Sequence, residues 1–180
     1  MNKIIAIVGM CGSGKSIASE YLEKELGYQK VYFGGVIYEK MKEENIEITP
    51  ESQKIYRENL RKKYGMGAVA EILLPKIKEL SKENNVVLDG LYSWAELKIL
   101  KKEFPNLNTI SIVVDKKIRY DRIKIRPDRP FNNQEAMDRD ISEIENLAKA
   151  GPIAYADYYI FNNGTIEEYI TRLNEILKQI

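Results

Sequence analysis

The chain has 180 residues, of which 44% are hydrophobic and 31% charged, and its formal net charge is +1. This length suits one domain with a substantial core, the near-zero charge argues against a nucleic-acid-coating protein, and no apolar run approaches the roughly 20 residues of a membrane span. Histidine is absent and Cys11 is the single cysteine, which excludes imidazole acid–base chemistry and an internal disulfide framework and favours a reducing, cytoplasmic location.

The first predicted strand, residues 3–8 (KIIAIV), leads into GMCGSGKS at residues 9–16, and a helix is expected over 16–26. The spacing G-x-x-x-x-G-K-[ST] is that of a phosphate-binding loop. Glycines let backbone N–H groups turn toward phosphate oxygens, and the following helix N-terminus adds positive potential. A glycine-rich strand-to-helix turn alone would not account for the Lys-Ser pair. We expect Lys15 to reach the β- and γ-phosphates of ATP and the Ser16 hydroxyl to bind Mg²⁺. The predicted nucleotide-binding positions of the loop are Gly9, Gly12, Ser13, Gly14, Lys15 and Ser16.

The next segments predict a strand over 29–33, a break at Gly34 and Gly35, and a helix after them. Thr49 and Pro50 predict a helix start. A further helix is expected over 67–83, bent at Pro75. Residues 84–90 (NNVVLDG) read as a buried strand that ends in an acid, Asp89. Such an acid beside a phosphate loop suits water-mediated Mg²⁺ binding, although an acid that merely ends a strand at a turn is also common.

The second half of the chain continues the alternation. Residues 93–96 (SWAE) form a capping-box pattern that opens a helix. The remaining expected elements are a strand over 108–115, a basic helix over 115–126, a helix over 134–150, a strand in 157–164, and a last helix capped by Thr165 with an apolar stripe of Ile166, Ile170, Leu173 and Leu177. Five strands joined by helices predict an α/β fold with a parallel sheet covered on both faces.

An arginine-rich segment, residues 116–132, follows the fourth predicted strand. Arginine forks suit the charge of a transferring phosphoryl group, so the segment predicts a lid over triphosphate; a solvated basic face is the alternative. Within it Arg119, Arg122 and Arg129 are expected to bind the triphosphate, and Arg122 and Arg126 to neutralise the transferring group. Arg139 in the next helix is a further candidate. Asn163, in the turn FNNG, is expected near the adenine base, unless this is only a strand-to-helix turn.

With these residues in view, the chain resembles the P-loop kinases of small molecules, which include adenylate kinase and dephospho-CoA kinase. It most resembles a poorly characterised, largely archaeal family related to both. The resemblance covers nearly the whole chain and rests on GMCGSGKS, ITPESQ, LRKKYGMGAVA, VVLDG, the arginine-rich segment and ADYYIFNNG. It implies a P-loop NTPase fold in one domain, with a five-stranded parallel sheet, a helical substrate insert at about 35–83 and a mobile arginine-rich lid at about 116–132.

The acceptor side departs from the relatives. Where they often carry Asp, Arg and Arg, this chain has Gly35, Tyr38 and Tyr92, whereas Arg61 matches a family arginine. A tyrosine offers a ring and a hydroxyl but no positive charge. Either an arginine such as Arg61 substitutes, or the acceptor is less charged at its reactive end; the two tyrosines could equally pack between helices.

The sequence therefore predicts an ATP-dependent phosphotransferase that acts on a nucleotide-like small molecule. Lys15, Asp89, Arg122 and Arg126 are its expected catalytic residues, and Ser16 and Asp89 its expected Mg²⁺ ligands. The alternative is an ATP-binding or ATP-hydrolysing regulatory or assembly protein, which the altered acceptor side would suit. An RNA- or DNA-end kinase would need an extended basic surface interleaved with aromatic residues, and the sequence has none.

Overall fold

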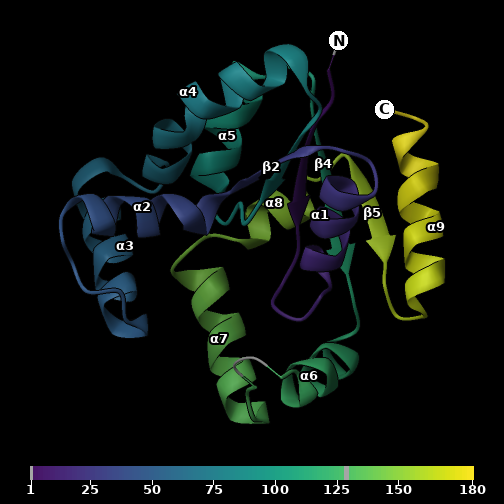
Figure 1. Ribbon diagram of the computed structural model, residues 1–180. Helices are drawn as coiled ribbons and strands as arrows, with labels where there is room; N and C mark the ends of the chain where they lie inside the picture. Colours follow the sequence, from purple (N-terminus) through teal and green to yellow (C-terminus); the bar gives the residue numbers. More distant parts are fainter. Residues whose placement is uncertain (1, 128–129) are drawn as a thin grey trace.

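Five parallel strands form the central sheet, in the order β2-β3-β1-β4-β5 (Figure 1). The computed structural model describes residues 2–127 and 130–180. The strands are β1 (Ile4–Val8), β2 (Gln29–Tyr32), β3 (Val86–Asp89), β4 (Leu107–Val113) and β5 (Tyr158–Phe161). The predicted five-stranded parallel sheet with helices on both faces is confirmed.

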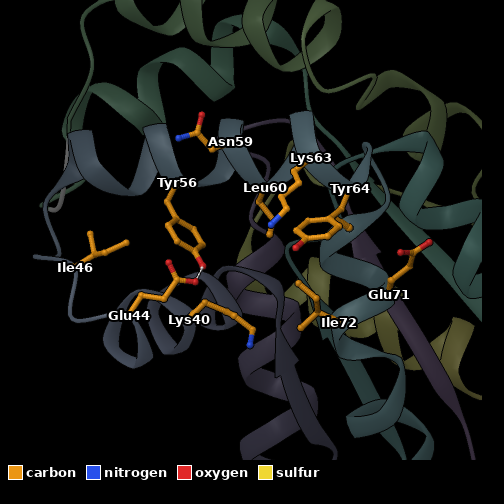
Figure 2. Close-up of a pocket in the computed structure, with 11 residues that line it drawn as sticks. Lys40, Glu44, Ile46, Tyr56, Asn59, Leu60, Lys63, Tyr64, Glu71 and Ile72 are labelled. Carbon is orange, nitrogen blue, oxygen red and sulfur yellow. Dashed lines mark hydrogen bonds between the residues drawn. The ribbon is translucent and has the colours of Figure 1, made fainter.

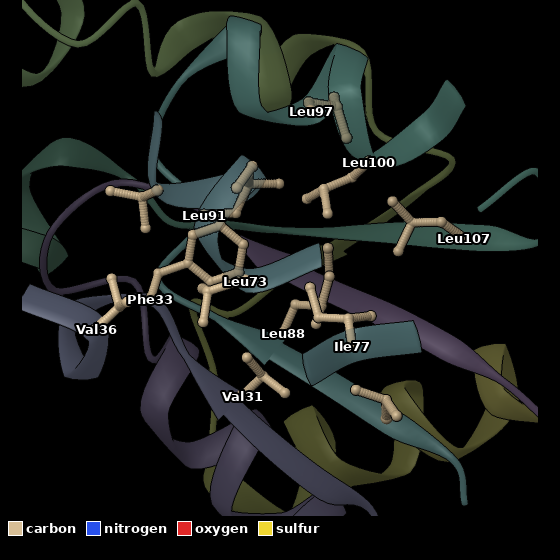
Figure 3. Close-up of a cluster of buried hydrophobic side chains, with 14 of the residues drawn as sticks. Val31, Phe33, Val36, Leu73, Ile77, Leu88, Leu91, Leu97, Leu100 and Leu107 are labelled. Atoms are coloured by element: carbon tan, nitrogen blue, oxygen red, sulfur yellow. The ribbon is translucent and has the colours of Figure 1, made fainter. Parts of the chain in front are cut away.

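Strand β1 occupies the middle of the sheet because every residue in it is apolar and buried. Its side chains alternate between two core layers, with Ile4 in one and Ile5 in the other. Helices α1 (Lys15–Lys24) and α9 (Ile166–Leu177) cover one face. Helices α4 (Ala68–Glu83), α5 (Trp94–Glu103) and α8 (Ala150–Ala154) cover the other. Figure 3 shows the core layer under α4 and α5, to which Ile4 also belongs; there Leu88 packs among side chains from these two helices.

Two helices project beside the sheet after β2: α2 (Phe33–Glu43) and α3 (Pro50–Tyr64) (Figure 1). The predicted strand over 29–33 is one residue too long, because Phe33 begins α2 and buries its ring in the core. Gly34 and Gly35 do not break the chain but lie in the first turn of α2. A Cβ on Gly34 would lie 2.5 Å from the Tyr32 hydroxyl oxygen, so a glycine there lets the Tyr32 ring fold over the helix start.

Helices α6 (Lys116–Ile125) and α7 (Asn133–Glu145) pack together below the sheet (Figure 1). The helix expected over 134–150 is wrong as one element: α7 ends at Glu145, and Ala148 has a φ of 50° before α8 begins. The predicted capping boxes at Ser93 and Thr165 are confirmed. The apolar stripe of α9 is shifted, since Ile166 is 59% exposed. Its buried residues are Tyr169, Leu173, Ile176 and Leu177.

No helix in the described part of the chain is long and apolar enough to cross a lipid bilayer.

Candidate functional site

The phosphate-binding loop lies between β1 and α1, at the carboxyl edge of the sheet. Its three glycines have positive φ angles: 149° at Gly9, 77° at Gly12 and 95° at Gly14. A Cβ on Gly9 would lie 2.6 Å from the carbonyl oxygen of Ile112, so the loop runs directly against β4. The glycines therefore serve both the turn of the backbone and its close approach to the sheet.

Two residues from the far end of the chain hold this loop in place. The Asn162 side-chain amide donates to the Ser13 carbonyl at 2.9 Å. The Tyr169 hydroxyl donates to the Gly14 carbonyl at 3.1 Å, and burial raises the pKa of that tyrosine. Because both acceptors are loop carbonyls, these two contacts occupy no loop N–H group, although the Ser13 N–H itself donates to the Met10 carbonyl at 3.2 Å.

Helix α6 packs against the same loop through Arg119. Its guanidinium donates to the Cys11 carbonyl at 2.9 Å and forms a bidentate pair with Asp140 of α7, at 3.0 and 2.6 Å. Arg119 is buried, so the residue expected to bind triphosphate is instead committed to holding the loop and α7 together. A Cβ on Gly12 would lie 2.7 Å from the Ile123 side chain, which confirms how closely α6 approaches.

Two other arginines of this segment, Arg122 and Arg126, lie near the loop. Arg122 donates to the Asn162 carbonyl at 2.9 Å. The Arg126 Nη1 lies 3.8 Å from the Cys11 sulfur, and its guanidinium stacks 4.9 Å from the Phe131 ring centre. Arg126 is thus beside the loop, as a triphosphate ligand would need to be. Arg129 lies outside the described residues.

Lys15 curls back over the loop, where its ammonium donates to the Met10 carbonyl at 2.9 Å. Burial, reinforced by the nearby Lys149 ammonium, lowers the pKa of Lys15 from 10.5 to about 7. Glu143, Cys11 and Asp89 oppose this shift only in part. A cation destabilised in this way gains strongly from a triphosphate, which would supply the missing negative charge.

Asp89 ends β3 next to β1, paired in register with Ile7. One carboxylate oxygen accepts a 3.0 Å hydrogen bond from Ser19, a fully buried residue whose hydroxyl also lies 3.1 Å from the Ser16 carbonyl. Ser16 itself is exposed in the first turn of α1. Ser19 was not predicted as a site residue, although its place one turn after Ser16 on α1 could have indicated it.

The Ser16 hydroxyl and the Asp89 carboxylate fit Mg²⁺, which takes hard oxygen ligands and usually keeps several waters. In residues 2–127 and 130–180 no group of three acidic, cysteine or histidine side chains gathers as a ready-made metal site. A magnesium ion here would therefore depend on oxygens from a bound triphosphate, as P-loop sites generally do.

A buried charge cluster that the sequence analysis missed lies between α7 and α8. Lys149 donates to Glu143 at 2.6 Å, and both side chains are only 2% exposed. The other oxygen of Glu143 accepts from Arg139 Nε at 2.9 Å. Burial alone would raise the pKa of Glu143, but the two cations hold it below its ordinary value. The Arg139–Glu143 spacing of four residues was visible in the sequence; the return of Lys149 onto Glu143 depends on the turn at Ala148.

The acceptor-side residues meet near the turn after β3. The Lys149 ammonium lies 4.8 Å from the Tyr92 ring centre. The backbone N–H of Tyr92 donates to Glu96 at 2.9 Å, and burial raises the pKa of the Tyr92 hydroxyl. Burial also lowers the pKa of Arg61, although the nearby charge of Glu96 opposes this. The structure thus brings Arg61 and Tyr92 into one region.

Two further predicted residues lie on α2, and a third has another role. Tyr38 is half-buried on α2, and Gly35 lies in the first turn of the same helix. Asn163 accepts a 3.0 Å hydrogen bond from the backbone N–H of Asp115, so its side chain braces a turn. Its neighbour Asn162 makes the contact with the loop.

A separate cavity of about 680 Å³ lies among α2, α3 and α4. Figure 2 shows Tyr56, Lys63 and Tyr64 entering it from α3, with a 2.6 Å hydrogen bond from the Tyr56 hydroxyl to Glu44. Its lining shares no residue with the phosphate-binding loop.

Comparison with known proteins agrees with this geometry. A family model described as an AAA domain matches residues 5–143. The UPF0200 protein of Sulfurisphaera tokodaii is 36% identical over 182 residues, which cover 99% of this chain and 97% of the relative. The UPF0200/UPF0201 protein of Archaeoglobus fulgidus is 35% identical over 99% of this chain, and the chain spans only 56% of that relative's length.

Solved structures with the same fold include TT1252 from Thermus thermophilus, at a TM-score of 0.65 and 18% identity over 99% of this chain and 98% of the other. Shikimate kinase from Bacteroides thetaiotaomicron follows at 0.63 and 17%, covering 98% of each chain. At these identities the likeness concerns the fold, which confirms the P-loop kinase-like architecture.

Proposed function

Because the chain belongs to the AAA-domain family of P-loop proteins and to the UPF0200 proteins, with a kinase-like fold, we propose that it is an ATP-dependent phosphotransferase acting on a nucleotide-like small molecule. The observation that carries the proposal is the state of Lys15. Its ammonium is packed into the loop beside Lys149, and the pKa is lowered to about 7, so the site favours a ligand of high negative charge. A triphosphate is such a ligand.

The loop N–H groups and Lys15 would bind the β- and γ-phosphates, while Asn162 and Tyr169 keep the loop in shape. Ser16 and Asp89 would hold Mg²⁺, which neutralises charge on the phosphates when bound. Arg126, beside Cys11, would approach the triphosphate from α6. Arg122 would act through the Asn162 backbone.

Arg139 would meet the transferring phosphoryl group. Its guanidinium is within electrostatic range of Cys11 on the phosphate loop and of Tyr92 on the acceptor side. The acceptor would enter beside Tyr92 and Arg61, under the helices that follow β2. Phosphoryl transfer needs mainly positioning and charge neutralisation, which these residues supply without an imidazole base.

The first test measures the binding of a non-hydrolysable MgATP analogue by calorimetry. Lys15→Ala should weaken it about 10- to 100-fold, the value of a charge-assisted hydrogen bond to phosphate. Lys24→Ala is the matched control, since Lys24 lies exposed at the other end of the same helix. Equal affinity in the two variants would refute the nucleotide site.

The second test separates a phosphotransferase from an ATP-driven regulator. ATP consumption is measured against a panel of nucleosides, nucleoside monophosphates and dephospho-CoA. Phosphorylation of one member supports the proposal. Stimulation by no small molecule, together with stimulation by a protein partner, would replace it with the regulatory function.

A further inference from the structure

Lys149 is a charged residue that the chain has buried almost completely, with 2% of its side chain exposed. Burying an ammonium is unfavourable unless it is paired, and even a paired buried ion often stabilises a fold no better than an apolar side chain would. Packing therefore does not account for a lysine at this place, whereas the contacts of its partner Glu143 do.

The backbone around Lys149 is bent to bring it onto Glu143. Ala148 adopts a φ of 50°, a left-handed conformation that is strained for a residue with a Cβ. This turn lets the backbone N–H of Lys149 donate to the Glu143 carbonyl at 3.1 Å, while its ammonium donates to the Glu143 carboxylate at 2.6 Å. Lys149 thus fixes Glu143 through both main chain and side chain.

Glu143 in turn holds Arg139 at its inner guanidinium nitrogen, Nε. Its second carboxylate oxygen accepts from Arg139 Nε at 2.9 Å, and the Arg139 side chain remains 45% exposed. No residue in 2–127 or 130–180 accepts a hydrogen bond from the two outer guanidinium nitrogens of Arg139. Those nitrogens are the pair that binds phosphate in a bidentate manner.

We propose that Lys149 is a positioning residue for phosphoryl transfer: through Glu143 it fixes the Arg139 guanidinium between the phosphate loop and the acceptor side, with its outer nitrogens free to take the transferring phosphoryl group. The proposal rests on the proposed function. It also gives Tyr92 a role, because the Tyr92 ring faces the Lys149 ammonium at 4.8 Å and closes the cluster on the acceptor side.

The first experiment reads the orientation of Arg139 without using activity. Lys149→Met keeps most of the side-chain volume and removes the ammonium. The Arg139 Nε–H resonance in ¹H–¹⁵N spectra should be protected from exchange in the wild type and lose that protection in the variant. Lys101→Met is the matched control, since it breaks an equally short pair, Lys101–Asp157 at 2.6 Å, away from the loop. Protection that survives Lys149→Met would overturn the proposal.

Should Lys149→Met fail to fold, the same Arg139 Nε–H resonance is measured in Glu143→Gln. One amide oxygen would then face two cations, and the more deeply buried Lys149 should keep it, which releases Arg139. An unchanged Arg139 resonance in Glu143→Gln would equally overturn the proposal.

The second experiment is a double-mutant cycle on turnover with the acceptor found by the panel. Lys149→Met should lower kcat about 10²-fold, as a misplaced catalytic group does, and should not raise the KM for MgATP, because loss of the Lys149 ammonium favours the charged form of Lys15. In the Arg139→Gln background it should have little further effect, because both changes remove one function. Effects that multiply would show that Lys149 does not act through Arg139. If no acceptor is found, the proposed function fails while the spectra still decide the role of Lys149.

Discussion

The lowered pKa of Lys15 predicts an unusual pH dependence of nucleotide binding. With a pKa of about 7, the amine is about nine-tenths protonated at pH 6 and about one-tenth protonated at pH 8. A bound triphosphate favours the ammonium form and restores its pKa to well above 8. The Lys15 amine should therefore take up about 0.9 proton on binding at pH 8, against about 0.1 at pH 6.

The same linkage sets the affinity. Above pH 7 the Lys15 amine must first be protonated, and this effect alone should raise the Kd for a non-hydrolysable MgATP analogue about tenfold from pH 6 to pH 8. A terminal phosphate with a pKa near about 6 loses its own proton over this range, which would strengthen binding to a cationic loop, so the two effects have opposite signs.

Calorimetry in buffers of different ionisation enthalpy measures the proton uptake and the Kd together. An uptake near zero at pH 8, or a Kd that falls steadily from pH 6 to pH 8, would show that Lys15 is already charged in the free loop. Burial and the Lys149 ammonium would then not lower the pKa of Lys15 in the free loop.

Three further variants test the structure. Asp140→Asn should lower the free energy of unfolding by about 3 kcal/mol or more in denaturant titrations, because the buried Arg119 loses its charge partner. The exposed control Asp138→Asn should change it little, and equal effects of the two variants would contradict the buried pair. Gly12→Val should abolish binding of the MgATP analogue in calorimetry by pushing α6 off the loop, while Gly27→Val, at a similar φ of 70° but in open space, should bind normally. Ala148→Gly should raise the free energy of unfolding by about 1 kcal/mol through relief of the left-handed strain, and a loss of stability would mean that the turn is not strained.

Local pattern was enough to predict the sheet and the loop. Residues 3–8 are an unbroken apolar run that only a central parallel strand can bury on both sides, and the glycines and Lys15 of the loop have one well-known spacing. The caps at Ser93 and Thr165 were predictable for the same reason: a capping box is complete within four residues.

Residues whose roles depend on distant partners could not be predicted in this way. Arg119 looked like one of several equivalent arginines until Asp140, on another helix, proved to be its partner. Lys149 lay in a segment that read as continuous helix, and only a left-handed Ala148 brings it back onto Glu143. Sequence spacing predicts which side chains lie on the same face of a helix. It does not show which of them already form hydrogen bonds or ion pairs with residues distant in the sequence.

The clamp on the phosphate loop has a consequence for how the protein is made. Ser13 is held by Asn162, which lies 149 positions further along the chain, and Gly14 is held by Tyr169, which lies 155 positions further along. A ribosome therefore synthesises the loop well before it synthesises Asn162 and Tyr169. A nascent chain stalled before residue 162 would carry the complete nucleotide-binding motif without either clamp. The phosphate-binding motif is thus synthesised well before the residues that hold its shape, and tight nucleotide binding should appear only once translation has passed Tyr169.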